Sequence, residues 1–348
     1  MPKVEDRKLT PKENMLRMYR HEQQEWVPIY TMGMPLPDGE DIPMTMIVPS
    51  IIAGQAAPTG NGLDVWGVKW VGSDSAGGGR LPEPNNFILD DITRWRDVIK
   101  APDLSDIDWE QMAKDDLKRS GVDREKTAIG QDTFIGPFQY LMAFMGFTEG
   151  MIALSEEPEE AHALLDYILD FYCEVQHKYY EALKPDVIIM ADDTCAYAKP
   201  FISEEMFREF FVPCYIRECE LPNQLGMPIQ FHNCGKAANF IEICHEEANI
   251  WGWDPCQNTN DMVAFKKKHQ NDISILGCFD PTGTPLVSND ATNEEVVAFA
   301  KEMIDTYAPD GGYAFMGGFV GPADDPDVQR KNKAVNDFAI DYCNNFYD

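Results

Sequence analysis

An imidazole and a thiol, His232 and Cys234, stand two positions apart in this chain and suggest metal chemistry. They lie where a predicted strand at residues 228–232 ends, so both side chains can point to the same side. Zinc prefers such ligands, and a catalytic zinc needs only three of them from the protein. Gly235 permits a tight turn, and Lys236 begins a predicted helix whose N-terminal amides favour a thiolate. The pair therefore predicts a catalytic zinc site. The alternative is a buried thiol packed beside a hydrogen-bonded histidine.

Thiols and carboxylates also follow the neighbouring predicted strands. Four consecutive strand ends each carry a thiol, and three add a carboxylate: Asp192, Asp193 and Cys195; His232 and Cys234; Asp254 and Cys256; Cys278 and Asp280. In barrels of parallel strands, chemistry takes place at these carboxyl ends. Asp192 and Asp193 are candidates for a metal ligand, an outer partner of His232 or a general acid/base, unless one of them caps a turn. Asp254 and Asp280 are further candidates of the same kind.

Five strand–helix units in series would position these residues. The predicted strands and the helices that follow them are 186–191 and 203–226, 228–232 and 236–247, 250–253 and 260–269, 273–277 and 293–307, and 312–316 and 325–346. A further helix is predicted at about 158–183, ahead of the first of these strands. Alternation of this kind is typical of a parallel sheet.

The first half of the chain is less regular. Strands are predicted at 27–31 and 127–130, with a third at 65–70, and the Gly- and Pro-rich stretch 32–84 predicts long loops. About eight strands predict an α/β fold of the closed (β/α)₈ type, a TIM barrel. We expect one domain over residues 1–348 with an N-terminal helical extension at about 1–25. A doubly wound open sheet is the alternative, but no Gly-x-Gly-x-x-Gly motif follows a strand.

The chain is strongly acidic, with 59 Asp and Glu against 29 Lys and Arg and a net charge of −30. This charge argues against binding to nucleic acid or to an anionic membrane. The charged residues 1–8 predict no signal peptide, and no apolar run approaches the roughly 20 residues that span a bilayer. The nine cysteines form no Cys-x-x-Cys pair and are expected to be reduced thiols. These features favour a cytoplasmic protein.

Several motifs together resemble a known family. They are Phe231–Lys236, Trp253–Gln257, Asn260–Met262 and Leu276–Pro281, with Asp192-Asp193 and Pro200–Glu205 before them. In these the chain resembles the uroporphyrinogen decarboxylase superfamily, and more narrowly its corrinoid-dependent methyltransferase branch, which includes O-demethylases and methylcobamide methyltransferases. The resemblance covers roughly residue 26 to the C-terminus and implies a (β/α)₈ barrel.

Two positions separate the branches of that superfamily. True decarboxylases carry an arginine-rich segment after the first strand, where this chain has Tyr30–Pro35 without arginine. The methyltransferase branch carries a His-x-Cys zinc pair, which His232 and Cys234 match. Members that use coenzyme M take a third ligand, a cysteine, from the last strand end, but Met316–Pro322 contains none. Cys278 is therefore expected as the third zinc ligand, with Cys256 or Asp193 as alternatives.

The resemblance implies methyl transfer between a small methylated substrate and the cobalt of a corrinoid carried by a partner protein, with Zn²⁺ as Lewis acid. O-demethylation of a methoxyaryl ether is favoured, because the coenzyme M-type ligand is missing. The alternatives are a methylcobamide:thiol methyltransferase and a uroporphyrinogen decarboxylase-like decarboxylase. The oligomeric state stays open, with a homodimer as one option. An aryl group would suit the aromatic residues expected near the loops, unless they are core: Trp66, Trp70, Phe134, Phe138 and Tyr140.

Overall fold

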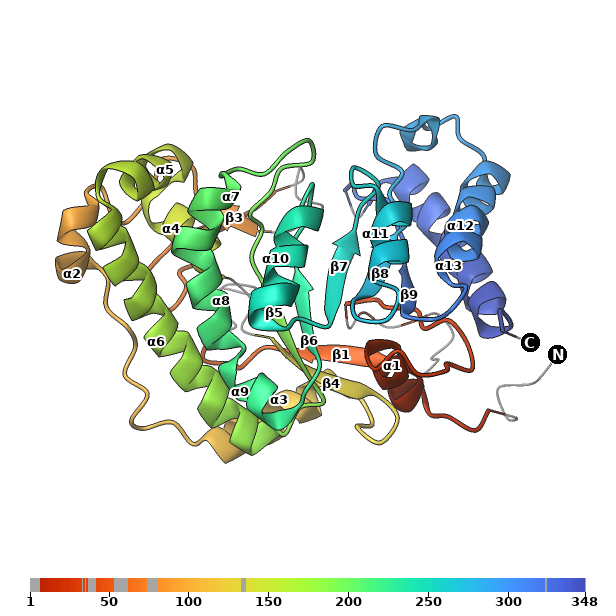
Figure 1. Ribbon diagram of the computed structural model, residues 1–348, viewed down its shortest axis with the longest axis horizontal. Coiled ribbons are helices and arrows are strands. Elements are labelled where there is room, and N and C mark those ends of the chain that lie inside the picture. Colours follow the sequence, from red (N-terminus) through yellow and green to blue (C-terminus); the bar gives the residue numbers. More distant parts are fainter. Residues whose placement is uncertain are drawn as a thin grey trace.

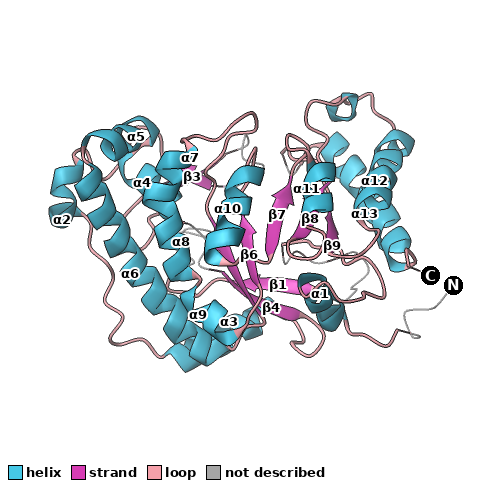
Figure 2. Ribbon diagram, in the orientation of Figure 1, coloured by secondary structure: helices cyan, strands magenta, loops and turns pink. Residues whose placement is uncertain are grey.

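The computed structural model of the chain describes residues 7–32, 34, 36, 42–52, 62–73, 80–132, 136–322 and 324–347. Its centre is a parallel sheet of seven strands in the order β1, β4, β5, β6, β7, β8, β9. The direction of the strands turns steadily across this order, so the sheet curls (Figure 2). The strands are Met44–Ile47, Ala128–Asp132, Val187–Ala191, Ile229–His232, Gly252–Cys256, Ser274–Cys278 and Tyr313–Met316. The fold is therefore α/β and resembles a TIM barrel.

Helices α6, α8 and α10 pack side by side on the outer side of the sheet (Figure 1), whereas residues of α1 join the cluster on its concave side. In chain order they are α1 Pro11–Tyr19, α2 Trp95–Val98, α3 Trp109–Ser120, α4 Pro137–Met145, α5 Phe147–Glu156, α6 Pro158–Leu183, α7 Glu204–Met206, α8 Val212–Glu218, α9 Glu220–Leu225, α10 Ala238–Ala248, α11 Met262–Lys268, α12 Asn293–Tyr307 and α13 Pro326–Asn344. Short 3₁₀ helices span Ile92–Arg94 and Pro285–Val287, and a π-helical turn spans Phe207–Phe211. Of the described helices, none is long and apolar enough to cross a membrane.

Two apolar layers hold the sheet. A large cluster lies between the sheet and the helices, where the strands contribute residues such as Phe231, Trp253 and Ile275. A smaller cluster joins Met44 of β1 to Leu276 of β8, strands that are not neighbours in the sheet, and therefore lies on its concave side. Residues of a strand alternate between the two faces of the sheet. Every second side chain, polar ones included, therefore points to the concave side.

The segment predicted as the first strand, residues 27–31, lies beside β9. It forms a single parallel bridge, Ile29 with Phe315. The Tyr30 amide donates to the Phe315 carbonyl at 2.8 Å, and the Phe315 amide donates to the Pro28 carbonyl at 2.9 Å. The segment thus takes the place next to the last strand, where an eighth strand of a barrel would lie. The closed (β/α)₈ barrel itself stays a prediction.

Two expectations for the first half of the chain were wrong. The strand predicted at 65–70 does not belong to the main sheet, because β2 (Trp70–Gly72) pairs antiparallel with β3 (Arg80–Pro82) in a separate ribbon. The first strand of the main sheet, β1, lies instead in the stretch predicted to be loop. This four-residue strand lies between Pro43 and Pro49 and is too short to show a strand-type pattern of apolar residues in the sequence. The five predicted strands of the second half, by contrast, all appear in the sheet.

Candidate metal centre

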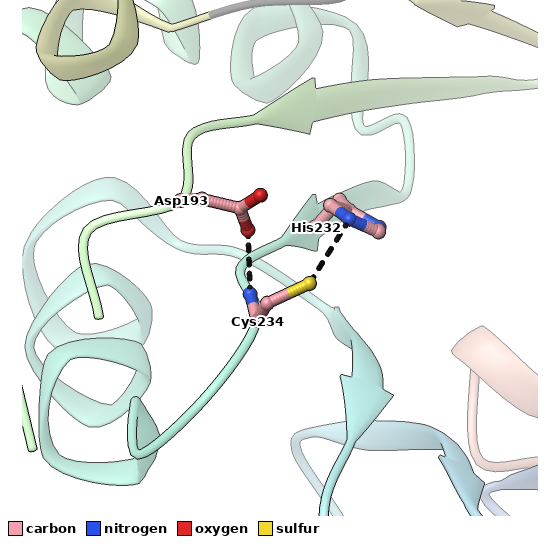
Figure 3. Close-up of side chains that lie close together, drawn as sticks. All are labelled: Asp193, His232 and Cys234. Atoms are coloured by element: carbon pink, nitrogen blue, oxygen red, sulfur yellow. Dashed lines mark hydrogen bonds between the residues drawn. The ribbon is translucent and has the colours of Figure 1, made fainter. Parts of the chain in front are cut away.

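Three potential ligands come together at the carboxyl ends of β5 and β6: Asp193, His232 and Cys234 (Figure 3). His232 is the last residue of β6, Cys234 lies in the loop after it, and Asp193 follows β5. Because β5 and β6 are parallel neighbours, with Ala191 opposite His232, their ends open at the same edge. One ligand atom from each residue lies within 4.8 Å of the others. All three side chains are partly exposed, so a small molecule can reach them.

The spacing of these atoms fits zinc. The Cys234 Sγ atom lies 3.6 Å from the His232 Nε2 atom. A zinc ion about 2.3 Å from a sulfur and about 2.0 Å from a nitrogen, at a tetrahedral angle, places those two atoms roughly 3.5 Å apart. A carboxylate oxygen completes a donor set of one imidazole, one thiolate and one carboxylate. The residues present therefore fit a three-ligand zinc site with a fourth position left for substrate.

His232 is oriented by a buried carboxylate. Its Nδ1 atom lies 2.9 Å from the Oδ2 atom of Asp254, which has no exposed surface. Burial lowers the pKa of His232, but the negative charge of Asp254 raises it, and the net pKa lies well above its usual value. A carboxylate on one ring nitrogen leaves the other to bind a metal, which is the usual arrangement at zinc histidines. Asp254 therefore acts through His232.

Cys234 is held by the same carboxylate that completes the group. Its backbone amide donates to Asp193 Oδ1 at 2.8 Å. Burial raises the pKa of the Cys234 thiol, and the hydrogen bond with His232 opposes that rise. Asp193 thus fixes the position of the loop at Cys234 and offers an oxygen beside the sulfur.

The turn after Cys234 requires glycine. Gly235 has a φ of +82°, and a Cβ atom there would lie 2.5 Å from the Ala196 carbonyl oxygen. The Lys236 amide donates to that same carbonyl at 3.0 Å, which ties the loop after β6 to the loop after β5. The Asn233 side chain adds a second tie, since its Nδ2 atom donates to Thr194 Oγ1 at 2.8 Å. The two loops that carry the ligands therefore form one connected unit.

Asp192, adjacent to Asp193, has a different environment. Its Oδ2 atom accepts from the Phe138 amide at 2.9 Å and from the Tyr215 hydroxyl at 2.7 Å, and its Oδ1 atom accepts from the Gln139 amide at 3.0 Å. The two amides belong to the first turn of α4. The Asp192 carboxylate, which follows β5, therefore caps the N-terminus of that helix. Burial raises the pKa of Asp192 to about 7, although these hydrogen bonds oppose the rise. These contacts give Asp192 a structural role, in line with one of its two sequence interpretations, and its role in the chemistry stays a prediction.

Asp280 also holds loops. Its Oδ2 atom accepts from the Asn258 amide at 3.2 Å, and its Oδ1 atom accepts from the Thr282 amide at 3.0 Å. It thereby connects the loop after β7 to the loop after β8. Among the described residues, Asp280 is not part of the group around His232.

The structure does not bring Cys278, the expected third ligand, to His232 and Cys234, and Cys256 is likewise absent from the group. Burial and the neighbouring Cys278 thiol raise the pKa of the Cys256 thiol well above its usual value, so the two thiols lie close together. Strand alternation predicted otherwise, because Leu276 points to the concave side and Cys278 stands two positions on. The alternation is broken at the end of β8, where Cys278 has a φ of +64°, and in β7 by a register shift between Trp253 and Cys256. Both thiols turn to the outer layer.

Three residues behind the site were not predicted from the sequence: Tyr19, Tyr30 and Gln230. Gln230 donates through Nε2 to Asp254 Oδ1 at 2.5 Å and to the Tyr30 hydroxyl at 3.0 Å, and it accepts a hydrogen bond from Tyr19. One signal was available, because Gln230 stands two positions before His232 in the same strand and shares its face. The aromatic residues considered for an aryl group are buried core instead, namely Trp66, Trp70, Phe138 and Tyr140, while Phe134 lies outside the described residues.

Comparison with known proteins supports both the fold and the family. Among solved structures, a methyltransferase from Methanosarcina mazei has a TM-score of 0.60 and 16% sequence identity, over 95% of this chain and 99% of that chain. A B12-independent methionine synthase from Shewanella sp. W3-18-1, in complex with selenomethionine, has a TM-score of 0.44 and 13% identity, over 81% of this chain and 75% of that one. No curated protein matches the chain. The model of the family described as uroporphyrinogen decarboxylase (URO-D) matches residues 105–326. The chain therefore belongs to the uroporphyrinogen decarboxylase family.

Proposed function

We propose that this chain is a zinc-dependent methyltransferase that moves a methyl group between a small methylated substrate and the cobalt of a corrinoid on a partner protein. The observation that carries the proposal is the group formed by Asp193, His232 and Cys234 at the carboxyl edge of the sheet. Its donor set suits a catalytic zinc with one open position. The fold it shares with a methyltransferase of similar length supports an enzyme of this type.

When bound, zinc would supply Lewis acidity toward the heteroatom of the substrate that carries the methyl group. The residues of the chain prepare the site for this role. Asp254 keeps the Nδ1 atom of His232 hydrogen-bonded, so that Nε2 faces Cys234. Asp193 holds the Cys234 amide and so fixes the sulfur relative to the imidazole. The partly exposed side of the group is the side on which a substrate would bind.

The favoured substrate is a methoxyaryl ether. When its oxygen–methyl bond breaks heterolytically, the oxygen keeps the electron pair, and a phenolate is a better leaving group than an alkoxide. A thiol as methyl acceptor is the alternative, because a thiolate also binds zinc well. A uroporphyrinogen-type decarboxylase is less well supported, because Tyr30–Pro35 contains no arginine for substrate carboxylates and the net charge is −30.

The proposal includes a protein partner and a cytoplasmic location. A corrinoid protein would have to approach the edge that carries Asp193 and His232. The nine cysteines, all of them free thiols, support a reducing compartment.

A transfer assay tests this function. The purified chain is mixed with a reduced corrinoid protein and, separately, with methoxyarenes, methanol, methylamines and methyl thiols, and methylation of the cobalt is followed by its absorption spectrum. We expect a methoxyarene to support methylation and the His232→Ala variant to be at least 100-fold slower, because a zinc ligand is lost. Methylation by none of these donors, or equal rates for the wild-type chain and the variant, would refute the proposed function.

A further inference from the structure

A buried chain of polar side chains runs from His232 to the opposite end of the sheet. It passes from His232 Nδ1 to Asp254 Oδ2 at 2.9 Å and from Asp254 Oδ1 to Gln230 Nε2 at 2.5 Å. The Oε1 atom of Gln230 then accepts from the Tyr19 hydroxyl. Asp254, Gln230 and Tyr19 are each at most 2% exposed. No solvent therefore competes with these hydrogen bonds.

The donors and acceptors of this chain match in only one orientation of the Gln230 amide. An amide has two N–H donors and one carbonyl acceptor. Its nitrogen faces the Asp254 carboxylate and, at 3.0 Å, the Tyr30 hydroxyl, whose own proton can reach the Met46 sulfur at 3.4 Å. Its oxygen faces the Tyr19 hydroxyl. If the amide turned over, its oxygen would meet the Asp254 carboxylate, and two acceptors would face each other in a buried site.

Tyr19 comes from α1, the helix near the N-terminus, and not from a strand of the sheet. This helix lies at the amino ends of the strands, where the Ser274 hydroxyl donates to the Met18 carbonyl at 2.7 Å. The Tyr19 ring reaches the interior beside Gly252, where a Cβ atom would lie 2.8 Å from the ring atom Cε1. Gly252 therefore provides the space through which an N-terminal side chain contacts the interior of the sheet.

We infer that Tyr19 and Gln230 are positioning residues for the metal centre, and that α1 is part of its support. Tyr19 fixes the Gln230 amide, Gln230 fixes the Asp254 carboxylate, and Asp254 holds the proton of His232 on Nδ1. In the neutral ring the Nε2 atom then carries no proton, faces Cys234 and is available to a metal ion. This inference rests on the proposed metal centre. It adds that the affinity of that centre depends on a hydroxyl group three hydrogen bonds away from the ligand.

The test is the Tyr19→Phe substitution, which removes the hydroxyl and keeps the ring. We expect the zinc affinity, measured by anaerobic competition with a chromophoric chelator, to fall about tenfold, the lower end of the effect of an outer partner. The matched control is Tyr179→Phe. The Tyr179 hydroxyl also donates to a buried carboxylate, Asp116 Oδ2 at 2.7 Å, but on the helix side of the sheet. This variant should bind zinc as tightly as the wild-type chain.

A second readout follows the histidine itself. The ¹⁵N chemical shifts of His232 in the metal-free chain, recorded at a pH high enough for the imidazole to be neutral, should show the proton on Nδ1 in the wild type and in Tyr179→Phe, and a mixture of tautomers in Tyr19→Phe. Equal zinc affinities and equal shifts for Tyr19→Phe and the wild type would overturn this inference and leave the metal centre intact. A wild-type chain that binds no zinc would overturn the proposed metal centre, and the inference with it.

Discussion

The Cys234→Ala substitution is expected to lower the zinc affinity of the chain by about 100- to 1,000-fold. Structural zinc sites bind the metal with about 10–16 kcal/mol at neutral pH, so one ligand of four contributes about 2.5–4 kcal/mol. The Cys234 sulfur, 3.6 Å from His232 Nε2, is the thiolate of this donor set. The affinity is measured by competition with a chelator on protein purified without oxygen. The rate of methyl transfer should fall by a similar factor.

The matched control for this substitution is Cys278→Ala. Cys278 is also a thiol at a strand end, but it is fully buried in the outer layer. We expect its loss to reduce stability and to leave the zinc affinity unchanged. If Cys278→Ala lost zinc and Cys234→Ala kept it, the ligand set derived from the structure would be wrong.

The Asp192→Ala substitution is expected to lower the free energy of unfolding by about 3–5 kcal/mol, because it leaves several buried donors without an acceptor. Those donors are the Phe138 and Gln139 amides and the Tyr215 hydroxyl. The loss also removes the carboxylate at the start of α4. Denaturant unfolding of the metal-free chain, in the presence of a chelator, measures this change.

The neighbouring carboxylate provides the contrast. Asp193→Ala should change the stability of the metal-free chain by less than about 1 kcal/mol, since Asp193 is partly exposed and accepts from a loop amide. The zinc affinity of Asp193→Ala should fall about as much as that of Cys234→Ala. Similar stability losses in the two variants would contradict the division of roles between these adjacent residues.

The sequence was sufficient to predict the second half of the fold. Buried parallel strands such as Val187–Ala191 are continuous apolar runs, and helices such as α12 begin with a capping box, here Thr292 with Glu295. The first half gave weaker signals. The strand β1 has only four residues, and the segment 27–31 contributes a single bridge to the sheet. Neither is long enough to show a period.

The site could be predicted in part. His232 and Cys234 are two residues apart at the end of one strand, so their proximity follows from local geometry. The third member of the group, Asp193, comes from another strand, and its selection over Cys278 depends on backbone details that no residue pattern shows. One is the left-handed conformation of Cys278, and the other is the register shift in β7. Asp254 was expected in the loop after its strand, but it lies within β7. From there its carboxylate contacts the Nδ1 atom of His232.

X-ray absorption at the zinc edge of the freshly purified wild-type chain tests the metal centre most directly. We expect one zinc per chain, with one sulfur ligand at about 2.3 Å and the remaining ligands nitrogen or oxygen at about 2.0–2.2 Å. The Asp193, His232 and Cys234 side chains supply one oxygen, one nitrogen and that single sulfur. Two or more sulfur ligands, or a chain that holds no zinc, would contradict the proposed metal centre.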